Sequence, residues 1–414
     1  MRRVVITGAG IVSCIGHDLA TVTEALKQGR SGITFNESYA EHEFKSHVSG
    51  SIDHSQLDTS AIDRKLKRFF SDASLYAYVS ALNAIEHAGL SLETINSNPR
   101  VGVVASSGGA STENIANAID AMREKGLRGV GAMAVPKTMG SSVSAALATG
   151  LKIQGISYSL TSACATSTHC IGHAAELIQL GKADVILAGG SEAEHWTQSC
   201  MFDAMGAVST QYNDTPELAS RAYDKDRDGF VLGEGAGCII LEEYEHALKR
   251  GATIYAELKG GGMSADADHM TGPHPEGLGA YLVMKNCLED EGLTADEVDH
   301  INMHGTSTPL GDLAESNAIS KLFGEHATDI QINSTKSMTG HLLGAAGVVE
   351  AIAAIHTIIH NIVPPTINHF TDDEKIDSRL NFTFNHAVEK EVNVAMSNTF
   401  GFGGHNACVL FSKI

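Results

Sequence analysis

Proline is scarce in this chain, with 8 residues among 414, whereas glycine occurs 42 times. No proline-rich linker and no low-complexity segment interrupts the sequence, which argues against domains joined by a long flexible tether. Abundant glycine with little proline is typical of a tightly packed α/β protein, because glycine lets backbones approach closely. Charged residues make up 19% and hydrophobic residues 43%, a globular rather than a disordered composition.

Cysteine is also infrequent, and its seven copies are irregularly spaced. An odd number without a repeating pattern does not predict a disulfide framework. None of the spacings has the form of a zinc finger. We therefore expect a reducing compartment, the cytoplasm, and no bound metal.

Basic residues are outnumbered, with 29 Lys and Arg against 49 Asp and Glu, for a net charge of −20. This balance argues against binding to nucleic acids or anionic membranes, since both require a basic field. The first residues, MRRVVITGAG, lack the apolar stretch of a signal peptide, and no uncharged apolar run reaches transmembrane length. We expect a soluble protein without a membrane segment.

Short apolar runs that end in small residues recur along the chain and predict buried strands opening into Gly/Ser turns. Helical patterns lie between them, and the pattern at 343–360 is apolar on nearly all sides, as in a core helix. A charged segment at 241–258 predicts a helix that leads into a new strand, so we place a boundary near residue 250. The predicted halves, 1–250 and 251–414, each hold a similar strand–turn–helix series and indicate a duplicated α/β unit. The runs lie at 4–10, 101–109, 185–193, 301–308 and 392–404.

The segment 158–181, YSLTSACATSTHCIGHAAELIQLG, contains the first candidate site residue. A β-rich stretch ends in small residues, Cys164 falls at the turn, and a helical pattern follows. A cysteine at the start of a helix lies at the positive end of the helix dipole, which predicts a lowered pKa and a reactive thiolate. The other six cysteines are interpreted as buried and inert, the ordinary state of a free cysteine.

Two histidines follow in the second half. In INMHGTSTPLGDLAES (301–316), His304 ends an apolar run, and Thr306 and Thr308 offer hydroxyls to an amide-bearing ligand such as a pantetheine arm. In NSTKSMTGHLLGAAGVVEA (333–351), Lys336 and His341 lead into the apolar helix. A buried cation needs a counter-charge, and Glu315 is a plausible one for Lys336.

Glycine-rich segments suggest a backbone site rather than a cofactor site. In SNTFGFGGHN (397–406), three glycines permit the close approach that an oxyanion site made of backbone N–H requires. TGAGIVSCIG (7–16) fails the dinucleotide fingerprint because Ser13 occupies the third glycine position. DGFVLGEGAG (228–237) lacks the Lys-Ser/Thr of a phosphate loop. We expect no organic cofactor.

These segments together resemble the β-ketoacyl-acyl carrier protein synthases, condensing enzymes of the thiolase superfamily. SACATS, HGTSTPLGD, STKSMTGHLLGAAG and SNTFGFGGHN follow one another in the family's order. The resemblance extends from Val4 to Leu410 and implies a thiolase-like, five-layered αβαβα fold built from two duplicated halves and assembled as a homodimer. His405 is a departure, because many bacterial members have Thr there.

The resemblance also implies roles for individual residues. Cys164 would carry the acyl group, and His304 and His341 would assist decarboxylation. Lys336 and Glu315 would order the site, while Phe400 would gate it and lend a backbone N–H to the oxyanion hole. The substrate would contact Thr306, Thr308, Gly109, Phe402 and Thr271. An acidic acyl carrier protein would dock on a locally basic surface, for which the candidates are Lys65, Lys67, Arg68, Arg123, Lys125 and Arg128.

The implied reaction is the decarboxylative condensation of malonyl-acyl carrier protein with an acyl group on Cys164, which elongates a fatty acid by two carbons. A thiolase would use a second cysteine near the C-terminus, but Cys408 lies beyond the GFGGHN turn in an apolar run. A non-catalytic chain-length factor would lack Cys164. A ketosynthase of a polyketide or aryl-polyene pathway remains an alternative. Several segments favour type I over type II, and Gly109 then stands where type II enzymes carry a bulky gating residue. The alternative for Gly109 is an unusual backbone angle that only glycine adopts.

Overall fold

The computed structural model describes residues 1–414, apart from the side chain of Glu291. Its main element is a ten-stranded mixed sheet. Five strands come from the first part of the chain: β1 (Val4–Ser13), β4 (Val101–Ser106), β5 (Ser157–Tyr158), β6 (Val185–Glu192) and β8 (Gly235–Glu243). Five come from the second part: β9 (Ala256–Ala265), β10 (His300–Asn302), β11 (Gln331–Asn333), β14 (Val394–Gly401) and β15 (His405–Ser412).

The two groups of strands have the same topology. From the sheet edge inward, the order is β5-β4-β6-β8-β1 in the first half and β11-β10-β14-β15-β9 in the second. When the five strands of each half are numbered along the chain, both halves have the order 3-2-4-5-1. In each half the first two pairings are parallel and the last two antiparallel. The halves join where β1 pairs with β9 at Val5–Glu257 and Ile6–Ala256. The predicted duplication is confirmed.

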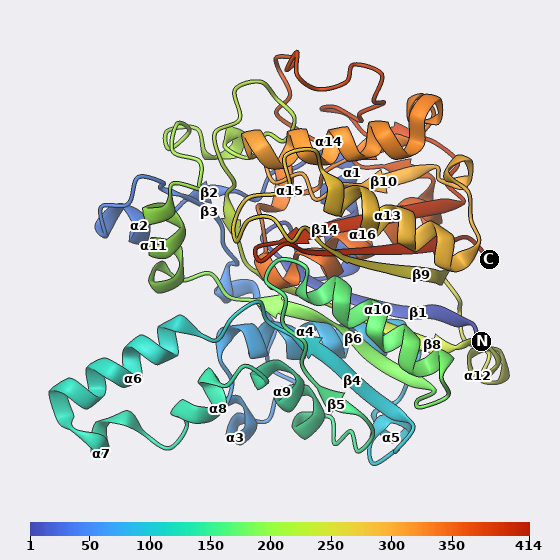
Figure 1. Cartoon of the computed structure of the whole chain (residues 1–414). Coiled ribbons are helices and arrows are strands. Elements are labelled where there is room, and N and C mark those ends of the chain that lie inside the picture. The colour runs from blue at the N-terminus through green and yellow to red at the C-terminus, as the bar shows by residue number, and fades with distance from the viewer.

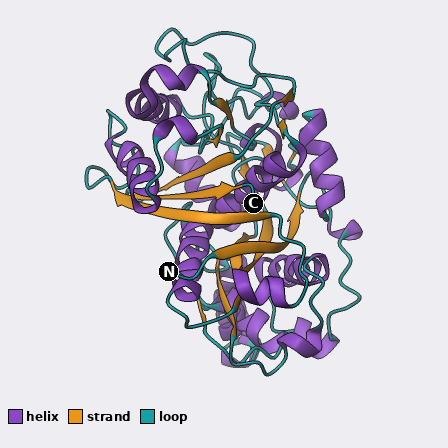
Figure 2. Ribbon diagram, turned by 90° about the vertical axis from the view of Figure 1, so that its right-hand side faces the viewer, coloured by secondary structure: helices purple, strands orange, loops and turns teal.

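Helices form the other three layers. α4 (Asp72–His87) and α9 (Ser142–Gly150) cover the outer face of the first half-sheet, and α13 (Leu278–Glu291) covers that of the second, with α14 (Pro309–Phe323) packed on α13. α10 (Thr166–Gln179) and α16 (Ala346–His360) lie side by side in the centre and contact strands of both half-sheets. Figure 1 shows the strands of the second half above those of the first, and Figure 2 gives the perpendicular view. The αβαβα prediction is confirmed.

The central helix α16 is apolar on nearly all sides, as its sequence predicts. Together with the turn before it, the segment Leu343–His360 has a mean hydropathy of 1.5 and is long enough to cross a membrane, yet 83% of it is buried inside the protein. It packs with α10 and both half-sheets in the largest core cluster, which includes Ile171, Ile239 and Ile352. The segment therefore forms part of the protein core.

The duplication also decides where the site lies. Cys164 precedes α10, the helix after the third strand of its half, and His341 precedes α16, the corresponding helix of the other half. Because α10 and α16 pack together, the two turns meet at one end of the central layer.

The remaining elements are short or peripheral. β2 (Thr34–Phe35), β3 (Val48–Gly50) and β7 (Leu232–Gly233) form a small sheet, and β12 (Ile362–Val363) pairs with β13 (Val388–Glu389). The other α-helices are α1 (Leu19–Gln28), α2 (Glu37–Glu41), α3 (Arg64–Lys67), α5 (Leu92–Ile95), α6 (Thr112–Lys125), α7 (Leu127–Val130), α8 (Ala134–Thr138), α11 (Trp196–Met205), α12 (Tyr244–Lys249) and α15 (Lys336–Thr339).

Candidate active site

Cys164 lies on a sharp elbow between β5 and α10. Ala163 has φ +51°, a left-handed conformation that costs a residue with a side chain about 1–2 kcal/mol. Thr166 holds the elbow, since its hydroxyl accepts from Ser162 N at 2.9 Å and donates to Ala163 O at 2.7 Å. The elbow aims the Cys164 side chain away from the helix into a cavity, with only 8% of the residue exposed.

The environment of the Cys164 thiol favours its protonated form. Burial raises its pKa to about 12, although the charge of Lys336 and a backbone N–H from Phe402 both act to lower it. The predicted lowering of this pKa by the helix dipole is therefore wrong, because α10 begins only at Thr166 and desolvation outweighs the favourable groups. A nucleophilic role for Cys164 therefore requires that this proton be removed.

The loop that joins β14 to β15 covers the elbow. A Cβ atom on Gly401 would lie 2.7 Å from Ser162 O and 3.1 Å from Cys164 N, so only glycine allows this approach. Phe400 pairs with Asn406 within the β14–β15 ladder, whereas the N–H of Phe402 donates to the Cys164 sulfur. The backbone N–H groups that act on the Cys164 thiol are thus those of Phe402 and Cys164 itself rather than that of Phe400.

His304 follows β10 at the C-terminal end of that strand. Glu315 on α14 holds its loop, with its two carboxylate oxygens accepting from His304 N and Gly305 N at 2.9 Å each. Asn398 Nδ2 and the Tyr223 hydroxyl donate to the same carboxylate at 3.3 and 3.2 Å. Glu315 is 1% exposed, and burial raises its pKa to about 7 against these four donors.

His341 lies beside His304. The backbone N–H of His341 donates to Val231 O at 2.7 Å, and its backbone C=O accepts from Gly233 N at 3.0 Å. These two hydrogen bonds attach the backbone of His341 to β7 and to the residue that precedes β7. The two imidazole rings are 5.2 Å apart at an angle of 85°. Burial and the charge of Lys336 hold the pKa of both imidazoles well below its usual range, so both rings are neutral at pH 7.

Lys336 lies beneath the two histidines and is 1% exposed. Its ammonium group forms an ion pair with Glu350 on α16, not with Glu315 as the sequence predicted. The partner differs because Glu350 stands one helical turn into the apolar helix that follows Lys336, while Glu315 is occupied by four other donors. Lys336 contributes a fixed positive charge beneath the cavity rather than a group that lines it.

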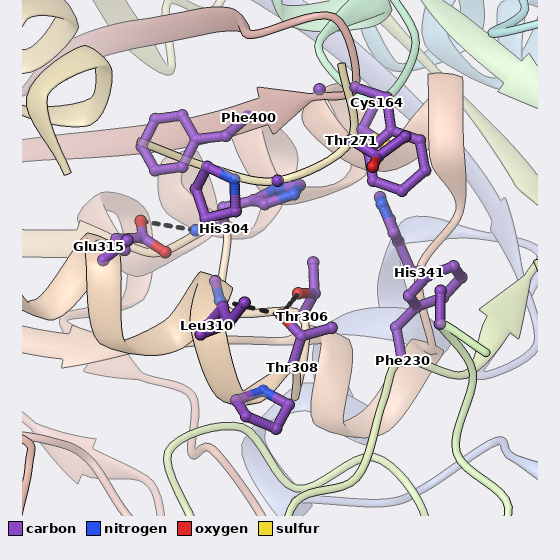
Figure 3. A pocket seen from close by; sticks show the side chains of 18 of the residues that line it. Cys164, Phe230, Thr271, His304, Thr306, Thr308, Leu310, Glu315, His341 and Phe400 are labelled. Carbon is purple, nitrogen blue, oxygen red and sulfur yellow. Dashed lines mark hydrogen bonds between the residues drawn. The ribbon is translucent and has the colours of Figure 1, made fainter. Parts of the chain in front are cut away.

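The cavity that these residues line has a volume of about 580 Å³. Its inner end holds Cys164, His304 and His341, and Thr306 and Thr308 follow toward the outside with their hydroxyl oxygens 3.0 Å apart (Figure 3). Thr271 and Leu310 stand at the exposed mouth. The structure thus brings together nine predicted site residues: Cys164, His304, His341, Glu315, Phe400, Phe402, Thr271, Thr306 and Thr308.

Three apolar residues of the inner wall escaped the sequence prediction. Phe202, Phe230 and Leu343 pack around Cys164, and the Phe230 ring meets His341 edge-on at 5.6 Å. Phe202 lies in a segment for which we predicted no element, Phe230 in the glycine-rich segment 228–237 and Leu343 at the start of the apolar pattern 343–360. Nothing in these patterns marks a pocket residue. Among the side chains that the structure describes, no group of three or more His, Cys, Asp or Glu is arranged to hold a metal ion.

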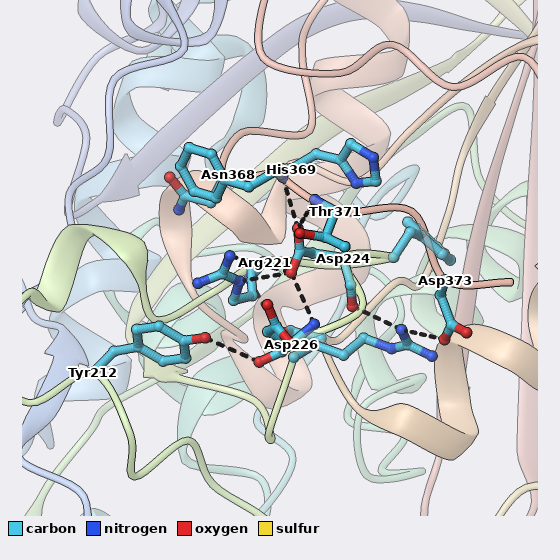
Figure 4. A network of polar contacts seen from close by, with 12 residues as sticks. Tyr212, Arg221, Asp224, Asp226, Asn368, His369, Thr371 and Asp373 are labelled. Atoms are coloured by element: carbon cyan, nitrogen blue, oxygen red, sulfur yellow. Dashed lines mark hydrogen bonds and ion pairs between the residues drawn. The ribbon is translucent and has the colours of Figure 1, made fainter.

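A buried polar network holds the mouth of the cavity. Arg227 donates to Thr308 O at 3.3 Å and to Pro309 O at 3.1 Å, and it pairs with Asp312 at 3.3 Å and Asp373 at 2.8 Å. The network continues through Asp224, which accepts from the backbone of Phe370 and Thr371 and pairs with Arg221 (Figure 4). Arg227 immediately precedes the wall formed by residues 228–230, so it ties that wall to the loop at 306–310.

Gly109 lies outside this cavity, in a separate small hollow beside Ser107 and Glu192. Its backbone is not left-handed, and a Cβ atom there would meet nothing within 4 Å. The alternative that Gly109 serves an unusual backbone angle is therefore wrong. Its role as an unobstructed gate stays a prediction.

Replacing Gly109 with isoleucine should leave the fold intact and slow the acylation of Cys164 selectively for medium and long chains. The space around Gly109 accommodates a side chain, and under the gate hypothesis this side chain blocks the entry of a longer acyl chain. Acylation by short and long acyl carrier protein substrates, measured with the melting temperature, checks this. A uniform rate loss with a lower melting temperature would contradict the gate.

The six candidate docking residues are all exposed. Lys65 and Lys67 lie on α3 and Arg68 directly after it, Arg123 and Lys125 on the last turn of α6, and Arg128 on α7. Lys67 contacts Thr59 and Arg123 pairs with Asp120, both at the surface. They form two basic clusters on an acidic protein.

Comparison with known proteins agrees with this geometry. Residues 1–247 match the family described as "Beta-ketoacyl synthase, N-terminal domain", and residues 255–370 match "Beta-ketoacyl synthase, C-terminal domain". The 3-oxoacyl-[acyl-carrier-protein] synthase 1 of Escherichia coli strain K12 is 49% identical over 416 residues, covering 100% of both chains.

Solved structures give the same result. A β-ketoacyl synthase from Burkholderia phymatum STM815 superposes with a TM-score of 0.94 at 35% identity, with 100% of each chain covered. A type II polyketide ketosynthase, AntDE, bound to its acyl carrier protein AntF, superposes with a TM-score of 0.88 at 30% identity, again over 100% of both chains. The chain belongs to the β-ketoacyl synthase family.

Proposed function

We propose that this enzyme elongates fatty acids by two carbons, with Cys164 as the acyl carrier and His304 and His341 as the groups that stabilise the enolate. The observation that carries the proposal is one cavity holding a buried thiol, a backbone N–H aimed at its sulfur, and two neutral imidazoles. The full-length relative named 3-oxoacyl-[acyl-carrier-protein] synthase 1 supports fatty-acid elongation and the type I assignment over the polyketide alternative.

In the first half-reaction, the Cys164 sulfur attacks the acyl thioester. The backbone N–H groups of Cys164 and Phe402 stabilise the tetrahedral oxyanion. The carrier thiol then leaves with a proton, and the acyl group stays on Cys164.

In the second half-reaction, malonyl thioester enters and loses its carboxylate as carbon dioxide. His304 and His341 donate hydrogen bonds to the thioester carbonyl, where negative charge develops as the C–C bond breaks. Lys336 strengthens this role, because its charge keeps both rings neutral and favours the enolate. The enolate carbon attacks the acyl-cysteine, the C–S bond breaks, and a 3-ketoacyl thioester forms.

The two half-reactions can be measured separately. Incubation with acyl-acyl carrier protein alone should add one acyl mass to the protein, and peptide mapping should place it on Cys164. Addition of malonyl-acyl carrier protein should then discharge it as a 3-ketoacyl product two carbons longer. An adduct at another residue would refute the proposed nucleophile.

We also propose acyl carrier protein as the partner that delivers both substrates. The AntDE structure supports this, since it holds a ketosynthase of the same fold with its carrier protein. Lys65, Lys67 and Arg68 form one receiving surface, and Arg123, Lys125 and Arg128 a second. Complementary charge raises the rate of encounter more than it changes the chemistry.

Charge reversal at Lys65 and Arg68 should raise the apparent KM for acyl carrier protein substrates several-fold and leave that for a small pantetheine thioester unchanged. The physical reason is that only the carrier protein reaches these exposed side chains. Steady-state kinetics with both substrates, at low and high salt, is the measurement. Equal effects on the two substrates would exclude docking at α3.

We also propose that the protein is a cytoplasmic homodimer and that its two halves meet at a boundary near residue 250. Supporting the dimer, α6, α7 and α8 project from the body (Figure 1) and expose Ile115, Ile119, Met122, Leu127 and Val135. Supporting the location, all seven cysteines, each within the described residues, are free thiols. The boundary falls between α12 and β9, where the strand order begins to repeat. Light scattering on the purified protein tests the dimer.

A further inference from the structure

Glu192 is a buried carboxylate that the mechanism above does not use. It ends β6 and is 3% exposed. Its Oε2 accepts from the N–H groups of Gly108 and Gly344, both at 2.9 Å, and its Oε1 accepts from the Ser107 hydroxyl at 2.8 Å. One carboxylate therefore joins the loop after β4 to the turn that leads from His341 into α16.

That turn is strained and tightly packed. Leu343 has φ +45°, which costs about 1–2 kcal/mol for a residue with a side chain and persists only where the surroundings enforce it. Gly344 approaches Gly108 so closely that a Cβ atom on it would lie 2.1 Å from Gly108 N. Hydrogen bonds from Gly108 and Gly344 to one carboxylate oxygen hold the two backbones at this separation.

The turn matters because Leu343 faces the reacting thiol. Its side chain packs with Cys164 and Phe230 and lines the inner end of the cavity. The backbone of His341 is fixed on β7, but this anchor lies before the turn, and the N–H of Gly344 within the turn requires a separate acceptor. Glu192 supplies it from the opposite side.

Glu192 near His341 resembles Glu315 near His304 in the hydrogen bonds that it accepts. Glu315 accepts two backbone N–H groups from the loop that carries His304, and Glu192 accepts one from the turn that follows His341 and one from the loop packed on it. Both carboxylates are almost fully buried, and burial raises the pKa of each to about 7. Each histidine thus has a nearby buried carboxylate that accepts hydrogen bonds from the backbone of its loop or turn.

We propose that Glu192 is a positioning residue for condensation: it fixes the turn after His341 and holds Leu343 against Cys164. The inference rests on the function proposed above for Cys164 and His341. It predicts that removing Glu192 lowers kcat and leaves KM unchanged. Substrate binding at the cavity mouth should persist, because the separate network of Arg227 and Asp312 holds that part of the site.

The test compares five variants of the full-length enzyme in steady-state condensation, with folding checked by melting temperature and circular dichroism. Glu192→Ala removes both carboxylate oxygens, and Glu192→Leu removes them while it keeps much of the side-chain volume. Ser107→Ala removes only the hydroxyl donor. Glu242→Gln is the matched control, since Glu242 is 0% exposed and lies at the far end of the β6–β8 pair. His341→Ala tests the underlying mechanism.

We expect Glu192→Ala to lower kcat at least about 10-fold, since misplacement by about 1 Å costs as much as 100-fold, with KM unchanged. Ser107→Ala and Glu242→Gln should stay within about threefold of the wild type, because neither disturbs both backbone contacts. Should Glu192→Ala not fold, Glu192→Leu decides on the same criterion. A normal kcat in the folded Glu192 variant, or an equal loss in Ser107→Ala or Glu242→Gln, overturns the inference. Full activity of His341→Ala would instead overturn the proposed function.

Discussion

Replacing Cys164 with alanine should abolish condensation while malonyl decarboxylation continues. The variant removes the one cysteine thiol among the residues that line the cavity, so no acyl-enzyme can form. The imidazoles of His304 and His341 and the N–H of Phe402 remain in place to stabilise an enolate. The truncation leaves a small void, because Cys164 packs in a compact cluster with Val208, Phe230, Leu232 and Leu343.

The measurement pairs intact mass after incubation with acyl-acyl carrier protein and carbon dioxide release from malonyl-acyl carrier protein. Cys170→Ala is the matched control: Cys170 is 0% exposed on α10, six residues along, and outside the cavity. The control should keep its acyl adduct and its condensing activity. An acyl adduct on Cys164→Ala would show that another residue is the nucleophile.

Resemblance and pattern together predicted the layers, the duplication and nine of the residues that line the cavity, but not Phe202, Phe230 and Leu343. The five apolar runs that end in Gly/Ser turns correspond to β1, β4, β6, β10 and β14, half of the strands in the main sheet. The ends of β10 and β14 carry His304 and the loop at 401–404 as expected. What the pattern could not supply was contact between segments distant in the chain. The sequence predicted Glu315 as the partner of Lys336, whereas the packing of α16 brings Glu350 to it instead.

The raised pKa of the Cys164 thiol could not be predicted from the sequence for a similar reason. A helix start indicates a favourable field, but the depth of burial depends on Phe230 and Leu343, which arrive from other segments. Their desolvation of the thiol outweighs the field. The same holds for Glu192, whose three donors come from residues 107, 108 and 344.

Substituting either histidine with alanine should lower malonyl decarboxylation about 100- to 1,000-fold, the usual cost of losing one donor to a developing oxyanion. Acyl transfer to Cys164 should continue at a reduced rate, since the backbone N–H groups of Cys164 and Phe402 are untouched. Carbon dioxide release and acyl-enzyme mass, measured on the same preparations, separate the two effects. Equal losses in both half-reactions would mean that the histidines serve the cavity as a whole rather than the enolate.

Glutamine at the same positions distinguishes the two ways in which a histidine can act. Both imidazoles are neutral, because burial and Lys336 keep their pKa values well below 6.5, so each can donate one hydrogen bond without carrying charge. The side-chain amide of glutamine also donates a neutral hydrogen bond, but it cannot accept a proton as a base. We expect His304→Gln and His341→Gln to recover decarboxylation by about tenfold over the alanine variants if donation is the function. Glutamine variants as inactive as the alanine variants, with melting temperatures equal to the wild type, would instead assign the histidines to proton transfer.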